Sequence, residues 1–278
     1  MKSKLILVEG LPGSGKSTTA RLTHDILIEN GVNAELYMEG NLDHPADYEG
    51  VAYFTEEEFE DLLIESGSLS EIFQDWVTVK RGRRLLPYMK IKNELGSGFP
   101  DELFAAISKK DVYELPLEEN IAESWEEFAK QAAVDEKVYI FECCFIQNPV
   151  TVGMVKYGCS DEITIDYVKK LAQAAAALNP LLVYVGQEDL DKSFRKAVTE
   201  RPEDWLNGFV HYYTSQGYGL SNKISGLEGT IDVLKARREL EYSILDHLTM
   251  NAYILNNSQF DFDKHKGNLR NVLKRYHY

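Results

Sequence analysis

A glycine-rich octapeptide near the N-terminus constrains the fold of this chain more than any other feature of its sequence. Residues 10–17 read Gly-Leu-Pro-Gly-Ser-Gly-Lys-Ser, which fits the pattern G-x-x-x-x-G-K-[ST]. Glycines in this pattern let successive backbone N–H groups point at phosphate oxygens, beside a helix N-terminus that carries partial positive charge. At average residue frequencies, a chance match in a chain of 278 residues has a probability of roughly one in a hundred. We therefore predict that this loop binds the phosphates of a nucleotide.

The segments on both sides of the loop supply the context that the pattern requires. Residues 4–9 form a short apolar run, which suits a strand buried on both faces of a parallel sheet. Residues 17–30 place apolar side chains on one helical face before an Asn-Gly stop, and residues 33–38 resume an extended pattern. The first 40 residues therefore predict a strand, loop, helix, strand unit with a right-handed crossover.

The pattern assigns a role to the polar residues of the loop. Lys16 is expected to reach the β- and γ-phosphates, and the Ser17 hydroxyl is expected to bind Mg²⁺. Ser17 and Thr18 also begin the helix, where a hydroxyl is useful as a cap without any ligand. The expected nucleotide-binding residues are Gly10, Gly13, Ser14, Gly15, Lys16, Ser17 and Thr18.

Apolar runs alternate with helical patterns along much of the remaining chain. Three further strands are expected at residues 138–141, 181–185 and 252–255. The helical patterns around them lie near residues 161–178, 190–200, 203–215, 229–249 and 264–276. Strands that alternate with helices predict an α/β fold with a doubly wound sheet.

The long segment between residues 44 and 135 departs from this alternation. It holds no convincing buried strand, whereas residues 56–65, 101–108 and 118–133 have helical, polar-faced patterns. We therefore read residues 1–278 as a single domain in which residues 45–135 form an inserted helical lobe on the substrate side.

The formal net charge of −15 limits the classes of partner. A field of this sign repels nucleic acid and anionic membranes, so neither is expected as a partner. Three cysteines are too few for a disulfide framework, and the most apolar later stretch is too short to span a bilayer. A cytoplasmic protein fits these properties best, and its oligomeric state stays open, with a homodimer as one alternative.

The stretch from Val8 to Thr18 resembles the opening of thymidylate kinases and related nucleotide, nucleoside and small-molecule kinases. The resemblance covers the first 40 residues well, the later strands loosely and the inserted lobe not at all. It implies a three-layer P-loop NTPase fold with five parallel strands in the order 2-3-1-4-5. It also implies ATP-dependent phosphoryl transfer, without naming the acceptor.

Features beyond the loop separate kinases from other P-loop proteins. A switch GTPase would show an Asn-Lys-x-Asp motif after a strand, whereas residues 222–225 read Asn-Lys-Ile-Ser and follow no expected strand. Remodelling ATPases usually carry a strand that ends in Asp-Glu, but the strand at residues 138–141 is followed by Glu142 and Cys143. One acidic residue at that place resembles the kinases better.

Three carboxylates are candidates for the chemistry. Glu142 closes a buried strand, where a charge is costly without a cation or donors, so it is expected to hold Mg²⁺ or to orient the acceptor hydroxyl. Glu39 resembles the glutamate that deprotonates the attacking hydroxyl in deoxynucleoside kinases. Asp43 is a weaker candidate for substrate binding. The sequence does not decide whether Glu39 or Glu142 is the base.

Basic residues in two segments are candidates for binding the transferred or accepted group. Residues 191–202 resemble a kinase lid, in which Arg195 and Arg201 would neutralise charge on the transferring phosphoryl group. Nearby acidic residues leave open a simple solvated helix face. Arg81 and Arg84 lie in the densest basic run, which either grips an anionic substrate or is a charged surface.

Together these features predict a kinase that uses Mg²⁺ and ATP to phosphorylate a small molecule such as a nucleoside or nucleotide. Lys16, Glu39, Glu142, Arg195 and Arg201 are its expected catalytic residues. GTP in place of ATP stays open. The alternatives are an ATP or GTP hydrolase that drives a conformational change, and a nucleotide-sensing interaction module.

Overall fold

The computed structural model describes residues 2–117 and 122–278. The chain divides into two compact units. The larger unit comprises Met1–Glu39 and Ala122–Tyr278, and the smaller unit comprises Gly40–Ile121. The glycine-rich loop at residues 10–17 belongs to the larger unit.

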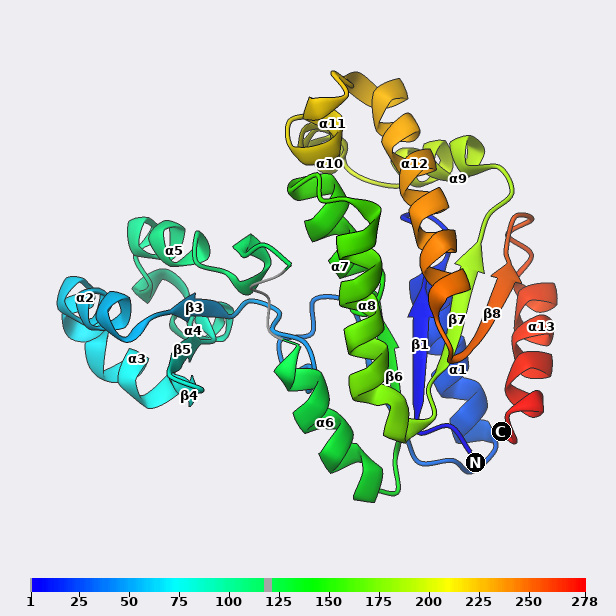
Figure 1. The fold of residues 1–278 in the computed structure, drawn as a ribbon, viewed down its shortest axis with the longest axis horizontal. Coiled ribbons are helices and arrows are strands. Elements are labelled where there is room, and N and C mark those ends of the chain that lie inside the picture. Colours follow the sequence, from blue (N-terminus) through cyan, green and yellow to red (C-terminus); the bar gives the residue numbers. More distant parts are fainter. Residues whose placement is uncertain (1, 118–121) are drawn as a thin grey trace. The chain divides into compact units, whose positions relative to one another are not determined.

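A five-stranded parallel sheet forms the centre of the larger unit (Figure 1). Its order is β2-β6-β1-β7-β8, which is 2-3-1-4-5 when these five strands alone are counted along the chain. Each strand lies within two residues of its predicted position. The strands are β1 (Leu5–Glu9), β2 (Ala34–Tyr37), β6 (Val138–Glu142), β7 (Leu181–Gly186) and β8 (Asn251–Asn256).

Helices pack on both faces of this sheet because its central strands are apolar on both sides. On one face, α1 (Lys16–Glu29) and α13 (Phe262–Arg275) bury a cluster that includes Ile6, Ile140 and Val183. Each such side chain contributes about 1.5–3 kcal/mol when it is fully buried.

The second face of the sheet is covered by α6 (Glu123–Val134), α8 (Asp161–Ala175) and α12 (Gly226–His247) (Figure 1). Aromatic contacts fix α6 here, since the Phe128 ring centroid lies 5.0 Å from that of Tyr139 and 4.8 Å from that of Phe141. The helix therefore belongs to the larger unit.

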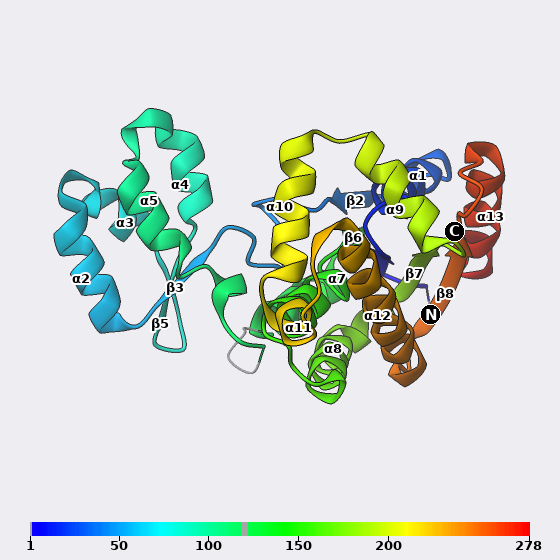
Figure 2. The same ribbon diagram turned by 90° about the horizontal axis from the view of Figure 1, so that it is seen from above.

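Several shorter helices lie beyond the carboxyl ends of the strands, and Figure 2 shows them from above. A π-helical turn, Thr151–Lys156, directly continues the first of them. These helices are α7 (Gln147–Val150), α9 (Leu190–Thr199), α10 (Glu203–Thr214) and α11 (Gly217–Ser221).

The smaller unit corrects the expectation of a purely helical insertion. It contains a three-stranded antiparallel sheet in the order β3-β5-β4. Strands of three or four residues are too short to show an alternating pattern, which is why the sequence did not reveal them. Its elements are β3 (Ala52–Phe54), α2 (Glu56–Ser66), α3 (Ser70–Trp76), β4 (Thr78–Lys80), β5 (Arg83–Leu86), α4 (Tyr88–Leu95) and α5 (Asp101–Ser108).

The boundaries of this unit differ from the expected insertion at residues 45–135. The unit ends before α6, because Trp125 and Phe128 of that helix pack on the parallel sheet. The helix expected at residues 118–133 begins at Glu123, and residues 118–121 lie outside the described part of the chain.

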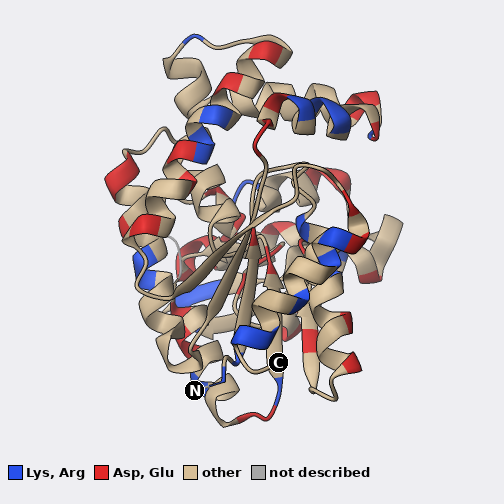
Figure 3. Ribbon diagram, turned by 90° about the vertical axis from the view of Figure 1, so that its right-hand side faces the viewer, with Lys and Arg blue, Asp and Glu red and all other residues tan. Residues whose placement is uncertain are grey.

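Acidic and basic residues are interspersed along the helices (Figure 3). The excess of acidic residues gives the net charge of −15. Among the described residues, no helix combines the length and the apolar character that a membrane span needs.

Candidate active site

The loop between β1 and α1 has the backbone conformation that its glycines make accessible. Gly10 and Gly15 have φ angles of 143° and 98°, which disfavour residues with a side chain. A Cβ atom on Gly10 would lie 2.6 Å from the Val185 carbonyl oxygen, and one on Gly15 would lie 2.6 Å from Asn257 Nδ2. Gly10 is therefore required for the packing of the loop as well as for its turn, because its contact is with backbone, whereas Gly15 meets only the end of a side chain and is required for the turn.

Side chains from the ends of β7 and β8 hold the loop in place. The Ser14 carbonyl accepts hydrogen bonds from Gln187 Nε2 at 3.1 Å and from Asn257 Nδ2 at 2.8 Å. Gln187 Nε2 also donates to the Asn257 carbonyl. Gln187 belongs to no motif, so sequence analysis could not have assigned it to the site.

Lys16 begins α1 and lies almost wholly inside the protein. Its side chain extends back over the loop, where Nζ donates a hydrogen bond to the Leu11 carbonyl at 3.2 Å. The same lysine lines the principal cavity of the larger unit. An ammonium group on the loop is placed to contact the terminal phosphates of a nucleotide held there.

Ser17 and Glu142 meet although 125 positions separate them in the sequence. The Ser17 hydroxyl donates to Glu142 Oε1 at 2.5 Å. A hydroxyl and a carboxylate that already touch form the hard oxygen donor set that Mg²⁺ prefers, so these residues fit that ion. The structure thus places the two expected metal ligands together.

Glu39 follows β2 and is held at both carboxylate oxygens. Oε1 accepts a hydrogen bond from Gln147 Nε2 at 2.8 Å, and Oε2 accepts one from Cys143 Sγ at 3.5 Å. The backbone N–H of Glu39 donates to Glu142 Oε2 at 3.3 Å. Carboxylate oxygens of Glu39 and Glu142 and the Cys143 sulfur lie within 4.8 Å of one another. The two candidate carboxylates therefore share one site.

Glu9 is a buried acid that sequence analysis did not assign to the site. It ends β1 and accepts hydrogen bonds from the backbone N–H groups of Phe145 at 2.8 Å and Gln147 at 3.0 Å. Burial raises the pKa of Glu9 to about 7, although these two N–H donors oppose the shift. Glu9 thus anchors the segment that leads from β6 into α7.

Glu9 makes the stability of the protein depend on pH. Since the folded state binds this proton more tightly than the unfolded chain, Glu9 destabilises the fold as pH rises from 4.5 to about 7. Over this pH range the free energy of unfolding should fall by about 3 kcal/mol. Urea denaturation should therefore show that the free energy of unfolding falls more between pH 5 and pH 8 in the wild type than in Glu9→Gln. Parallel losses in the two proteins would contradict this prediction.

A cavity of about 980 Å³ extends from the loop across the carboxyl edge of the sheet. One end is formed by Lys16 and Ser17, and Glu39 and Gln147 also line it. The opposite wall is aromatic and comes from α10, where the rings of Phe209 and Tyr213 stack at 4.2 Å. The volume is large enough for a nucleotide with a second small molecule beside it.

The two expected lid arginines have different surroundings. Arg201 lines the cavity, and its guanidinium carbon lies 4.1 Å from the centre of the Trp205 ring. Arg195 does not belong to the described cavity lining. Instead it pairs with Asp191 and Glu228, both at 2.6 Å. Of the two, the structure brings only Arg201 to the site.

The expected substrate-binding residues Asp43, Arg81 and Arg84 all belong to the smaller unit. Asp43 pairs with Lys90 at 2.7 Å, and Arg84 pairs with Glu56 at 2.6 Å. Arg81 lies in the turn between β4 and β5 with a φ angle of 48°. Their contacts are described within that unit alone, so their contact with substrate stays a prediction.

A buried arginine of α12 is the most constrained charged group near the cavity. The Arg237 side chain is 0% exposed and bonds Glu241 Oε1 through Nε at 2.7 Å. It also donates to the Thr151 hydroxyl at 2.9 Å and to the Tyr213 hydroxyl at 2.6 Å. In the sequence an Arg and a Glu four positions apart look like a surface pair, so no signal indicated this network.

No protein-family model matches this chain, and no curated protein matches its sequence. Among solved structures it is similar to the crystal structure of APE1195, with 13% identity over 99% of this chain and 96% of that one, at a TM-score of 0.41. It is also similar to thymidylate kinase from Candida albicans, with 13% identity over 100% of this chain and 94% of that one, at a TM-score of 0.39. At TM-scores this low, the likeness assigns neither a family nor a reaction.

Proposed function

We propose that this chain is a P-loop kinase that transfers the γ-phosphoryl group of ATP to the hydroxyl of a small molecule. Its larger unit would then be a three-layer P-loop NTPase fold. The observation that carries the proposal is the convergence of Lys16, Ser17 and Glu39 on one cavity, with Glu142 bonded to Ser17. A group that binds the phosphates, a pair of residues that binds the metal ion and a second carboxylate that can accept the acceptor's proton are the parts that phosphoryl transfer requires.

The contacts of the two carboxylates favour a division of roles between them. Glu142 is bonded to Ser17, so it is proposed to hold Mg²⁺ with that hydroxyl. Bound Mg²⁺ would neutralise charge on the phosphate oxygens. Glu39 lines the same cavity, with its carboxylate on Gln147 and Cys143 and not on Ser17, and it is proposed to be the general base.

In the proposed reaction the acceptor oxygen forms a bond to the γ-phosphorus as the bond to the β,γ-bridging oxygen breaks. The hydroxyl proton passes to Glu39, and the electron pair of the broken bond leaves with ADP. Lys16 and Arg201 would stabilise the negative charge on the transferred group, because both are cationic and both line the cavity.

The proposal is tested by incubating the protein with γ-labelled ATP, Mg²⁺ and pooled nucleosides, nucleotides, sugars, amino acids and aminoglycosides. A labelled organic product that is absent with Lys16→Ala would support the kinase and identify its acceptor class. Competition by unlabelled GTP would measure the choice of nucleotide. Free phosphate as the only product would favour a hydrolase, and nucleotide binding without turnover would favour a sensor.

The metal-binding role of Glu142 has a test that does not depend on turnover. Glu142→Gln removes one carboxylate charge from the pair with Ser17, so Mn²⁺ in the presence of ADP should bind about 10–100-fold more weakly. Free Mn²⁺ is measured directly by electron paramagnetic resonance. Glu162→Gln, on the exposed surface of α8, should retain wild-type affinity. Equal affinities in all three proteins would rule out the proposed ligand.

A further inference from the structure

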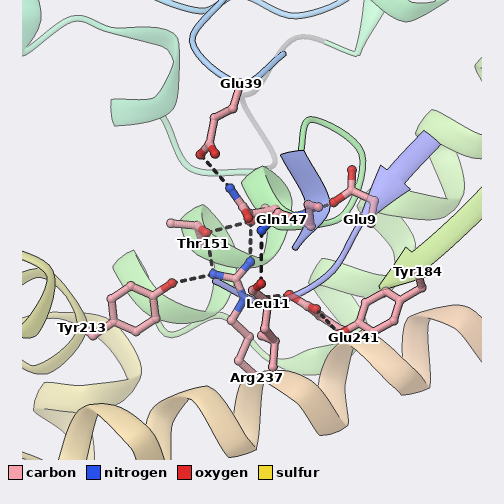
Figure 4. Close-up of polar contacts among 10 residues, drawn as sticks. Glu9, Leu11, Glu39, Gln147, Thr151, Tyr184, Tyr213, Arg237 and Glu241 are labelled. Carbon is pink, nitrogen blue, oxygen red and sulfur yellow. Dashed lines mark hydrogen bonds and ion pairs between the residues drawn. The ribbon is translucent and has the colours of Figure 1, made fainter. Parts of the chain in front are cut away.

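Gln147 contacts buried charged side chains through its backbone and Glu39 through its side chain. Its backbone N–H donates to Glu9 Oε2 at 3.0 Å, and its carbonyl accepts from Arg237 at 3.1 Å and from the Thr151 hydroxyl at 2.7 Å. Its side-chain Nε2 donates to Glu39 Oε1 at 2.8 Å. Figure 4 shows Gln147 between Glu39 and Arg237.

The orientation of the Gln147 amide follows from the chemistry of its neighbour. An ionised carboxylate can only accept hydrogen bonds, so the nitrogen of the amide must face Glu39. The amide oxygen is buried and has no hydrogen-bond partner among the described residues. The amide nitrogen thus bonds Glu39 while the amide oxygen makes no hydrogen bond with the described residues. A buried amide oxygen without a hydrogen bond costs free energy.

Buried charges fix the backbone of Gln147 from two sides. Glu9 lies at its N–H and Arg237 at its carbonyl, and both side chains are fully buried. Arg237 is itself held by Glu241, which accepts a second hydrogen bond from the Tyr184 hydroxyl at 2.6 Å. Burial lowers the pKa of Arg237, but Tyr213 and Glu241 outweigh that effect, so the arginine stays charged. Buried side chains therefore hold the backbone of Gln147 at both its N–H and its carbonyl.

We propose that Gln147 is a positioning residue that orients the Glu39 carboxylate toward the acceptor hydroxyl. This inference rests on the proposed function. It assigns to Glu39, the proposed base, a supporting residue that belongs to no sequence motif. Glu39 is exposed, so without this contact its side chain would sample several rotamers. The amide holds one oxygen of Glu39, while the hydrogen bond that the described residues give the other oxygen comes from the weak thiol donor of Cys143.

The test compares Gln147→Met, which keeps the length of the side chain but removes the donor, with Gln173→Met on the exposed surface of α8. With Mg-ATP and the acceptor found in the pooled screen, Gln147→Met should lower kcat about 10–100-fold and leave KM for ATP unchanged. Gln173→Met should match the wild type. An unchanged kcat in Gln147→Met would overturn the proposal.

The KM for ATP distinguishes positioning from a general loss of structure, because a disturbed site would also bind the nucleotide more weakly. A rise in the KM for ATP that accompanies the fall in kcat would mean that Gln147 acts only on the fold.

A double-mutant cycle and a crystal structure complete the test. If Gln147 acts through Glu39, then Gln147→Met should cause no further loss of kcat in the Glu39→Gln background. Losses that add would overturn the proposal. The crystal structure of Gln147→Met should show the Glu39 side chain in several rotamers. One unchanged Glu39 rotamer would refute the positioning role whether or not the chain proves to be a kinase.

Discussion

Replacement of Lys16 by alanine should lower the rate of labelled phosphoryl transfer by about 10²–10³-fold. The ammonium group lies at the cavity wall, where it can offset the negative charge that builds up on the transferring group. Most of this stabilisation exists only in the transition state, so kcat should fall more than the affinity for nucleotide. The measurement is single-turnover transfer from γ-labelled ATP.

Lys170→Ala, on the exposed surface of α8, is the matched control for this experiment and should retain wild-type activity. Lys16 is buried, so the thermal midpoint of Lys16→Ala must be measured alongside its activity. Lys16→Met, which retains the apolar stem of the lysine, should show the same loss of rate. A rate within about threefold of wild type in either variant would be incompatible with Lys16 as a phosphate-binding residue.

Replacement of Arg237 by methionine should lower the free energy of unfolding by about 3–5 kcal/mol. The substitution leaves the carboxylate of Glu241 in the interior, where this side chain is 0% exposed, without its cationic partner. It also removes the donors to the Thr151 hydroxyl and the Gln147 carbonyl. Urea denaturation, followed by circular dichroism, measures the change.

Arg195→Met provides the control, because its ion pair with Asp191 also spans four positions but the Arg195 side chain is 42% exposed. It should lower the free energy of unfolding far less than Arg237→Met does, because solvent screens an exposed ion pair. The double variant Arg237→Met, Glu241→Met should recover most of the stability, since an apolar pair leaves no buried charge. A cost of Arg237→Met no larger than that of Arg195→Met would contradict the buried network.

The three central strands of the parallel sheet could be predicted because each is a largely apolar run that is buried on both faces. Residues 138–141 and 181–185 lie in β6 and β7, whose residues are all buried. The strands of the smaller unit gave no such signal, because β4 has three residues and two of them are exposed. Periodicity needs more residues than these strands contain.

The sequence by itself determined the local chemistry of the loop: its glycine positions, its lysine and its serine belong to one octapeptide, and local spacing governs their geometry. It also brought forward Glu39 and Glu142 as candidates. Only the tertiary structure decided what each one contacts, since Ser17 meets Glu142 across 125 positions and Gln147 meets Glu39 across 108.

Arg195 of α9 and Arg237 of α12 show the same limit most clearly. Each has an acidic residue four positions away, and the sequence offers no means to tell them apart. In the structure Arg195 is 42% exposed, whereas Arg237 is fully buried and supports the residue that contacts Glu39. Burial follows from the packing of segments that are distant in the sequence. That packing decides whether breaking an ion pair changes the free energy of unfolding slightly or strongly.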